Sequence, residues 1–162
     1  MAALYGCLTI MIDITDVASL RARVGQEIAV SGWLEVTQAR IQQFADATGD
    51  QQWIHLDTER ATAESPFGST IAHGFLTLSL LSPLIRDALH FTGLRLAVNY
   101  GLNRVRFVSP VPAGARVRAR IVPGSVGEVA GSIQVVWNVT IEREHADKPA
   151  CVAEWIVRYD VR

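Results

Sequence analysis

One short stretch of the sequence carries an acid and an imidazole at close spacing. In ATGDQQWIHLDTERA, residues 47–61, Asp50 directly follows a glycine and His55 stands five positions later. A carboxylate and an imidazole that face each other can hold and polarise one water, which general acid/base addition or removal of water requires. Spacing alone favours a plainer interpretation, because an Asp after Gly commonly serves a turn and a loop histidine is usually solvated.

A second candidate site is the AHGF stretch, in which His73 and Gly74 stand at the start of a predicted buried helix. The first turn of a helix has backbone N–H groups without partners and a partial positive charge, and a glycine there lets a ligand approach closely. Such an N–H can stabilise an enolate-like or thioester oxygen. By itself the motif is better explained by close helix–sheet packing and a buried histidine bonded to a carbonyl.

Arginines recur with a period of two in the second half of the chain. One set is Arg104 and Arg106, and the other is Arg116, Arg118 and Arg120. Period two puts each set on one strand face, where guanidinium groups can meet the phosphates of a nucleotide-bearing substrate or an acidic carrier protein. For most of them we expect the ordinary alternative, the solvated face of a sheet.

The elements that would position these residues begin with a predicted strand over residues 27–36. Thr37 can then cap an amphipathic helix, and Gly49 stands where that helix should end. Asp50 and His55 would therefore lie in a connecting loop rather than on one helix face.

A short helix and a long one are predicted next. Asp57 is a predicted N-cap for a helix over residues 58–64, TERATAE. Residues 71–90 are apolar almost all round, which predicts a buried helix, with a kink near Ser82 because Pro83 lies inside it. Charged and helix-breaking residues within this stretch argue against a membrane span.

The second half reads as strands that alternate polar and apolar residues. A predicted bulge at Gly101 lies in the first of them, and a turn over residues 109–114 follows it. The predicted strands cover residues 94–108, 115–122, 132–143 and 150–161. Helices followed by adjacent strands indicate an α+β fold, a single domain with an antiparallel sheet wrapped on a helix.

The composition is that of one globular domain. The chain has 162 residues, of which 49% are hydrophobic and 19% charged, with a net charge of −1. Without a basic balance we expect no nucleic-acid partner and no anionic membrane surface. Cys7 and Cys151 form no CxxC motif and no metal-like set with histidine, so we expect free thiols, no metal and a cytoplasmic protein.

The first residues are predicted to lie outside the domain. The apolar start of the chain lacks a basic region and meets Asp13, so it predicts neither a signal peptide nor a spanning helix. We expect residues 1–12 to be a disordered extension and residues 13–162 to form the domain. Met11 is an alternative start of the protein.

Three stretches together resemble one known family. FADATGDQQWIH, PFGSTIAHGFLTLSLLS and NYGLNRVRFVSPVPAGARVRA are similar, in this order, to the MaoC-like dehydratases, the (R)-specific enoyl-CoA hydratases. The resemblance covers about residues 25–160 and implies the hot-dog fold, a long central helix wrapped by an antiparallel sheet. The family motif G-D-x-N-P-x-H spans Gly49 to His55 here, with Gln52 and Trp53 in place of Asn-Pro.

The resemblance also implies roles for the candidate residues. Asp50 and His55 would form the dyad that holds the catalytic water, the Gly74 N–H would polarise the thioester carbonyl, and Ser82 would support the aspartate. Three further side chains are candidates for contact with the substrate: His73, Arg104 and Arg106.

The implied reaction is reversible syn addition of water to a trans-2-enoyl thioester in fatty-acid metabolism, giving an (R)-3-hydroxyacyl thioester. Asp50 would accept a proton from the water, and His55 would position that water and supply a proton to C2. No cofactor is implied, since CoA or acyl carrier protein is the handle of the substrate. The resemblance also implies a homodimer with sheets joined edge to edge.

Three alternatives remain at this point. A hot-dog acyl-CoA thioesterase would use a carboxylate for hydrolysis, although its motifs differ from those above. A non-catalytic subunit of a heterodimeric dehydratase would have no need to keep both Asp50 and His55. An acyl-thioester binding module would bind without turnover. Acyl chain length, the choice between CoA and carrier protein, the direction of the reaction and the effect of Gln52-Trp53 are left open by the sequence.

Overall fold

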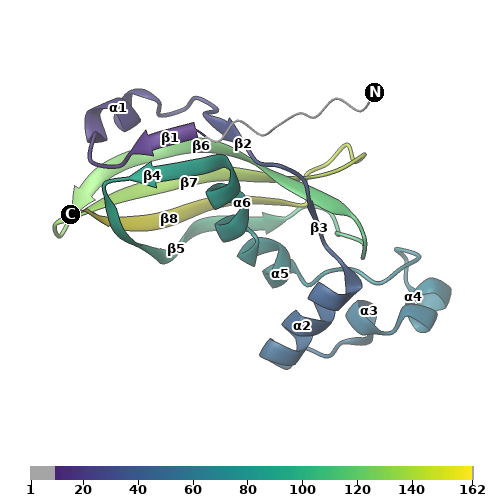
Figure 1. Cartoon of the computed structure of the whole chain (residues 1–162). Helices are drawn as coiled ribbons and strands as arrows, with labels where there is room; N and C mark the ends of the chain where they lie inside the picture. The colour runs from purple at the N-terminus through teal and green to yellow at the C-terminus, as the bar shows by residue number, and fades with distance from the viewer. Residues whose placement is uncertain (1–9, 162) are drawn as a thin grey trace.

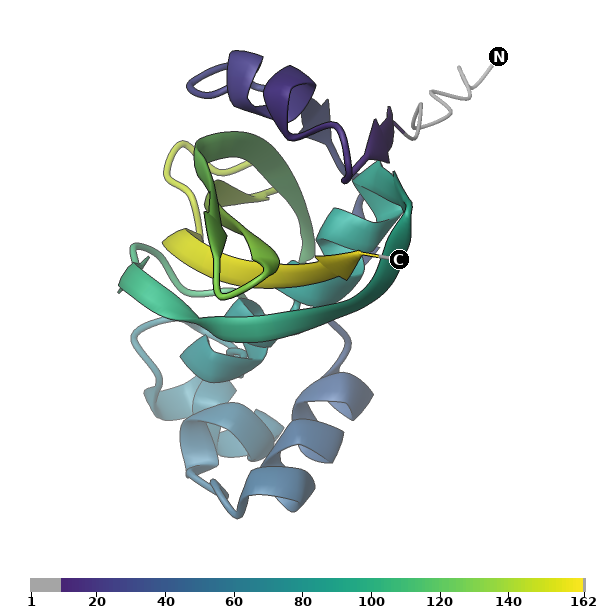
Figure 2. The same ribbon diagram turned by 90° about the vertical axis from the view of Figure 1, so that its left-hand side faces the viewer.

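The computed structural model describes residues 10–161 and consists of a curved antiparallel sheet, two helical segments against it and a helical extension at one end (Figure 1). Figure 2 shows the curvature of the sheet, with α6 (Leu81–Ala88) on its inner side. The chain is thus an α+β domain in which the sheet wraps helical segments, as expected from the order of its elements.

Four long strands form most of the sheet. They are β5 (Leu94–Phe107), β6 (Arg116–Val129), β7 (Ser132–Arg143) and β8 (Cys151–Val161). With the short strand β2 (Ala29–Val30), the order is β2-β6-β7-β8-β5, so β5 is an edge strand. Its pairing with β8 shifts register between Asn99 and Gly101. The bulge predicted at Gly101 is therefore confirmed.

The predicted strand over residues 27–36 is wrong as one element. It is replaced by two short strands, β2 (Ala29–Val30) and β3 (Leu34–Glu35), which both pair with β6. The break lies at Gly32, whose N–H donates to the Asp87 carboxylate at 2.6 Å instead of continuing a ladder. A contact with a distant helix therefore divides the strand.

The N-terminal part of the described chain adds a small second sheet. Strand β1 (Ile10–Asp13) pairs in parallel with β4 (Leu89–Thr92), and helix α1 (Val17–Ala22) follows it. The predicted boundary between extension and domain must therefore move, because residues 10–12 belong to the fold. Residues 1–9, including Cys7, lie outside the described residues.

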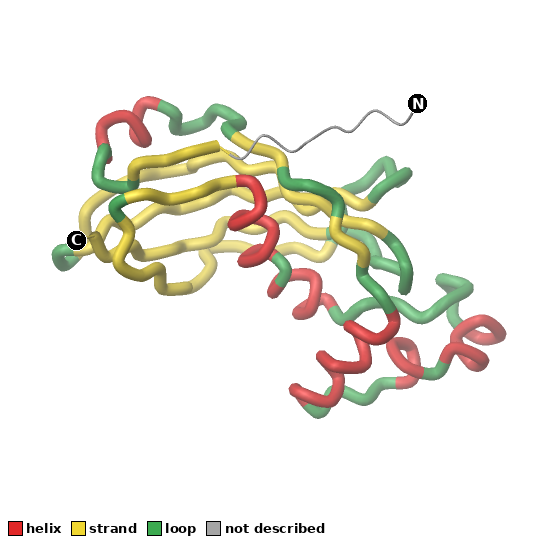
Figure 3. The backbone as a smooth tube through the Cα atoms, viewed as in Figure 1, coloured by secondary structure: helices red, strands yellow, loops and turns green. Residues whose placement is uncertain are grey.

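The helical extension comprises α2 (Gln38–Thr48), α3 (Trp53–Leu56) and α4 (Thr58–Glu64). The predicted caps are confirmed: the Thr37 side chain accepts from the Arg40 N–H, and the Asp57 side chain accepts from the Arg60 N–H. In Figure 3 these helices lie beyond the end of the sheet and are joined by short loops.

The predicted helix over residues 71–90 is instead two segments, α5 (Gly74–Ser79) and α6 (Leu81–Ala88), followed by β4. The break falls at Leu80 rather than near Ser82. Pro83 has no N–H to donate to the Ser79 carbonyl, so the helix is interrupted one turn earlier, and Pro83 is then tolerated in the first turn of α6. Among the described helices, none is long and apolar enough to cross a membrane.

The core lies between the concave face of the sheet and the helical segments. Alternate residues of β7 are buried, as the period-two pattern predicts, and Trp137 is fully buried. Leu84 and Ile85 of α6 are buried against this face. Each fully buried side chain of this size stabilises the fold by roughly 1.5–3 kcal/mol, which fixes α5 and α6 and therefore the site at the start of α5.

Candidate active site

The helical extension places Asp50 and His55 next to each other. Gly49 ends α2 in the left-handed conformation, with φ of 79°, so that the chain reverses and presents Asp50. Three residues after Asp50 the chain enters α3, and His55 lies in that helical turn rather than in an open loop. Asp50 is exposed, whereas His55 is 7% exposed.

An extended segment, Thr70–His73, carries the other half of the site. It is fixed to the turn before β6 by two backbone hydrogen bonds, from the Ala72 N–H to the Val111 carbonyl at 2.8 Å and from the Ala113 N–H to the Thr70 carbonyl at 3.0 Å. The segment leads directly into α5, so its position relative to the sheet decides where the start of that helix lies.

The His55 ring is held by this segment. Its Nδ1 lies 2.7 Å from the Ile71 carbonyl oxygen. A carbonyl oxygen can only accept, so Nδ1 carries the proton and the Nε2 of the neutral ring offers a lone pair. Burial lowers the pKa of His55 below its ordinary value, the Ile71 hydrogen bond and Asp50 oppose this, and His73 lowers the pKa further.

Three side chains converge at this site. Polar side-chain atoms of Asp50, His55 and His73 all lie within 4.8 Å of one another. One water about 2.8 Å from each of two such atoms can bridge them. The two imidazoles are stacked, with ring centroids 3.8 Å apart and planes 28° apart.

Gly74 is the first residue of α5 and supplies a free donor. Its N–H donates to no acceptor in the part of the chain that the structure describes, and His73 before it makes no side-chain cap. A Cβ at Gly74 would lie 3.0 Å from the ring of Phe107. Glycine therefore leaves room for the Phe107 ring beside the uncapped Gly74 N–H. An N–H without an acceptor is suited to stabilising an oxyanion.

The other predicted site residues lie elsewhere in a single chain. Ser82 is exposed on α6, eight residues after Gly74 and so about 12 Å further along the helical direction. It lines a cavity of about 100 Å³ with Asn99 and Trp155. Within the described residues no hydrogen bond joins Ser82 to Asp50, so its supporting role remains a prediction.

The arginines also lie apart from the dyad. Arg106 donates to the Val105 carbonyl at 2.7 Å, and Arg104 lies on the exposed edge strand near Glu154. The second set forms ion pairs on the outer face of the sheet, as expected for a solvated face: Arg116 with Glu144, Arg118 with Glu142 and Arg120 with Glu27. Substrate contact by Arg104 and Arg106 is thus still a prediction.

Two residues that the sequence analysis did not single out, Gln38 of α2 and Thr70 of the extended segment, brace the dyad. Gln38 donates from its side chain to the His55 carbonyl at 2.8 Å and accepts from the Thr70 hydroxyl at 2.5 Å. Thr70 is 2% exposed, so this bridge is shielded from water. Nothing in the local sequence marks either residue, because their partners lie 17 and 32 positions away from Gln38.

The departure from the Asn-Pro pair of the motif has a structural explanation. Trp53 stands at the first position of α3, where proline is a favoured residue because its missing N–H would have no helical acceptor. Trp53 keeps the same helix start, and the Arg60 guanidinium lies 4.2 Å from its ring centroid. The helical turn that presents His55 therefore forms in this chain without a proline.

Comparisons with known proteins agree with this geometry. Residues 19–145 match the model of the family described as MaoC like domain. The 3-hydroxyacyl-thioester dehydratase Z of Mycobacterium tuberculosis is 52% identical over 145 residues, covering 89% of this chain and 95% of the relative.

Solved structures share the fold. The R-hydratase PhaJ1 of Pseudomonas aeruginosa has a TM-score of 0.65 at 24% identity, covering 86% of this chain and 83% of that one. A chain of the truncated HadBC (3R-hydroxyacyl-ACP dehydratase) complex of Mycobacterium tuberculosis has a TM-score of 0.65 at 19% identity, covering 85% and 96%. The expected hot-dog architecture is confirmed, and the chain belongs to the MaoC-like domain family.

Proposed function

We propose that this protein is a hydro-lyase that adds water reversibly, in syn fashion, to a trans-2-enoyl thioester and forms an (R)-3-hydroxyacyl thioester. One observation carries the proposal: the Asp50 and His55 side chains approach within 4.8 Å beside the uncapped start of α5. The similarity to a 3-hydroxyacyl-thioester dehydratase at 52% identity supports the same reaction class in fatty-acid metabolism.

The hydrogen bond at Nδ1 of His55 defines the proton transfers. Because Nδ1 holds its proton toward the Ile71 carbonyl, the free Nε2 lone pair of the neutral ring is the base. The resemblance assigns proton acceptance to Asp50; we instead propose His55, because its Nδ1 is engaged by the Ile71 carbonyl. The Asp50 carboxylate accepts the second O–H of the water, orients it and stabilises the imidazolium that forms.

The atoms balance in one cycle. The water oxygen bonds to C3 while its proton passes to Nε2 of His55, and the electron pair of the double bond moves to the thioester oxygen. The Gly74 N–H stabilises that enolate oxygen. Nε2–H then protonates C2 from the same face, which gives syn addition and restores the neutral ring. The reverse order removes water.

The thioester supplies the activation, and we expect no cofactor. Its carbonyl acidifies C2, so CoA or acyl carrier protein acts as the handle of the substrate. We place the protein in the cytoplasm, where the buried Cys151 thiol, whose pKa burial raises to about 11, would stay reduced.

We also propose that two copies associate through β5. This edge strand exposes apolar side chains, among them Val98 at 47% and Tyr100 at 55%. Two antiparallel copies of one edge strand pair symmetrically, and pairing covers both the apolar side chains and the free backbone groups. A self-complementary edge favours a homodimer over two different subunits.

The deciding experiment is a hydration assay. Purified protein would be mixed with trans-2-enoyl-CoAs of increasing chain length, and loss of the conjugated enoyl absorbance followed. We expect turnover to an (R) product, and Asp50→Asn and His55→Gln to lower kcat by about 10²–10⁴-fold.

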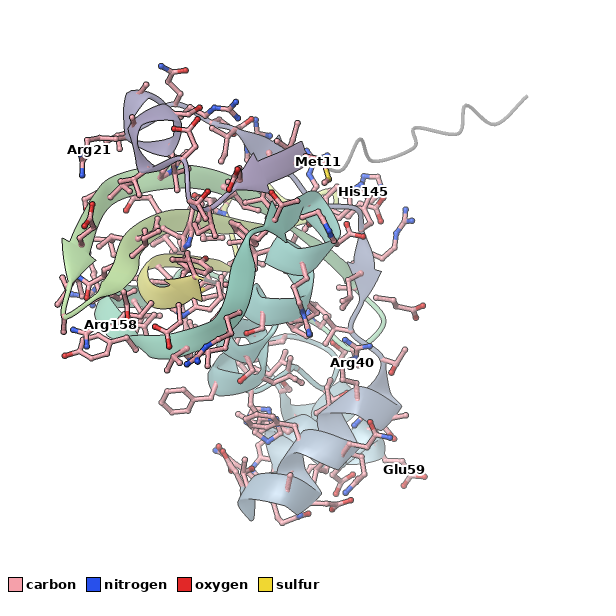
Figure 4. The ribbon with its side chains drawn as sticks, turned by 60° about the vertical axis from the view of Figure 1, so that its left-hand side comes forward. Met11, Arg21, Arg40, Glu59, His145 and Arg158 are labelled. Atoms are coloured by element: carbon pink, nitrogen blue, oxygen red, sulfur yellow. The ribbon has the colours of Figure 1, made fainter. Side chains whose placement is uncertain are left out.

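The controls are Glu59→Gln and His145→Gln, which remove a carboxylate charge and a histidine at exposed positions. Figure 4 shows Glu59 on the helical extension and His145 at a different end of the molecule. Both should keep wild-type rates. Release of free CoA without hydration would establish a thioesterase instead. Absence of turnover with both CoA and carrier-protein substrates would contradict the proposal.

A further inference from the structure

His73 lies directly against the dyad without reaching the surface. Its side chain is buried, with 2% exposure, and its ring stacks on the His55 ring at 3.8 Å, while Phe44 of α2 covers it at 5.0 Å. We infer that His73 is a positioning residue, which fixes the Asp50 backbone and the plane of the His55 ring. This inference rests on the proposed hydro-lyase function and names a role within it.

The link to Asp50 is a hydrogen bond between elements. The Nε2 of His73 donates to the Asp50 carbonyl oxygen at 3.0 Å. Within its own loop, the Asp50 backbone is held only weakly, because the Asp50 nitrogen and the Thr48 hydroxyl oxygen are 3.5 Å apart. Since Gly74 follows His73 directly, one residue ties the loop that presents the carboxylate to the N–H that would hold the enolate oxygen.

The stacking constrains the second member of the dyad. His55 is fixed in its own plane by the Nδ1 bond to Ile71, and the His73 ring prevents rotation out of that plane. The groups whose charge acts on His55 are His73 and Asp50. From α2, the uncharged side chain of Phe44 contacts the His73 ring, and the uncharged side chain of Gln38 donates to the His55 carbonyl.

The hydrogen bonds assign opposite tautomers to the two rings. His73 carries its proton on Nε2, which faces a carbonyl, and its Nδ1 is buried without a partner among the described residues. His55 carries its proton on Nδ1. The burial of His73 also leaves no face for a substrate, so the predicted substrate contact is replaced by this indirect role.

Two variants separate the two contributions. His73→Gln can keep a donor toward Asp50 but loses the ring, and His73→Phe keeps a stacking ring but loses the donor. We expect each to lower kcat by about 10- to 100-fold, since small displacements of reacting groups cost up to about 10²-fold, with KM changed less than about threefold. His145→Gln, at an exposed histidine, is the control.

A pH profile distinguishes positioning from mere core filling. His73 lowers the pKa of His55, so His73→Phe should move the acid limb of kcat/KM to higher pH, whereas His145→Gln should leave it unchanged. Reduced kcat with a shifted limb supports the inference. Unchanged kcat in both variants, or a raised KM at constant kcat, would overturn it. The inference would also be overturned if His73→Phe lowered kcat and Tm but left the acid limb of kcat/KM at the same pH.

Nitrogen-15 spectra test the arrangement without turnover. The chain has four histidines, so a labelled sample gives few signals, and His73→Phe and His55→Gln assign two of them. We expect the Nε2–H tautomer at His73 and the Nδ1–H tautomer at His55. The reverse tautomer at His73 would contradict the inference even in an active enzyme. If the tautomers are as expected but the wild type does not hydrate enoyl thioesters, the proposed function fails instead.

Discussion

At the scale of single residues, the environment of His55 determines when the site can work. In the proposed reaction, hydration begins with the neutral ring, because the Nε2 lone pair would receive the water proton. Burial lowers the pKa of His55 below its ordinary value of 6.5, so the ring is neutral over more of the acid range than a solvated histidine. The lowered pKa of His55 should therefore extend activity to lower pH.

This gives a prediction for the pH dependence. As pH falls, kcat/KM should decline only when protonation of His55 removes the base, and the midpoint of that limb should lie below 6.5. Initial rates between about pH 4.5 and 8 would measure it, with the enzyme checked for reversible inactivation. A limb centred above 6.5 would contradict the assignment of the neutral ring as the base.

The Gly74 N–H can be removed with little change in backbone. His73 already has φ of −57° and ψ of 140°, which suits a residue before proline, and Gly74 is the first residue of α5, where proline is favoured. Gly74→Pro should lower kcat by about 10²–10³-fold relative to Gly74→Ala, as expected for loss of one oxyanion donor.

The alanine variant is the matched control for that test. Both substitutions place a Cβ about 3.0 Å from the Phe107 ring, so the crowding is shared and only the N–H differs. Circular dichroism and Tm would show whether both variants fold. Equal rates for the two variants would mean that the Gly74 N–H does not hold the reacting oxygen.

At the scale of elements, the start of α3 sets the direction of His55. Trp53 occupies the first helical position, and Gln52 before it is extended with ψ of 134°. Trp53→Pro should therefore keep the turn, with kcat/KM within about threefold of wild type, because proline fixes the required φ and loses no helical hydrogen bond.

The contrasting variant is Trp53→Gly. It removes both the ring beneath Arg60 and the restriction on φ, so Tm and kcat should fall below those of Trp53→Pro. Thermal unfolding and steady-state rates would be measured for both proteins. If proline abolished activity while glycine preserved it, the helix start would not explain how this chain dispenses with the Asn-Pro pair.

Elements defined by neighbouring residues could be predicted from the sequence. Thr37, Gly49 and Asp57 were identified because a cap bonds to residues only a few positions away. The division at Gly32 could not be predicted, since it depends on Asp87, 55 positions distant. The dyad followed from the family motif, but the contact of His73 with Asp50 required the folded chain to bring the two together.

At the scale of the whole molecule, β5 is an edge strand that exposes apolar side chains. The strand is unpaired along one edge, and its apolar side chains include Val98 and Tyr100. Asp50 is also exposed in a single chain, although a buried, water-poor site strengthens the electrostatic stabilisation on which the proposed reaction depends. Association of two chains through β5 would therefore cover this apolar edge.

A charge on the edge tests this association. Val98→Lys places an ammonium group on β5, and lysine on an edge strand opposes pairing with another edge. Light scattering should show the mass of two chains for the wild type and of one chain, 17.7 kDa, for the variant at micromolar concentration. Val129→Lys is the control, because Val129 is also exposed but ends β6 at a hairpin. A wild type that is monomeric and fully active would overturn the homodimer, whereas loss of activity only in the Val98→Lys monomer would tie the site to the paired state.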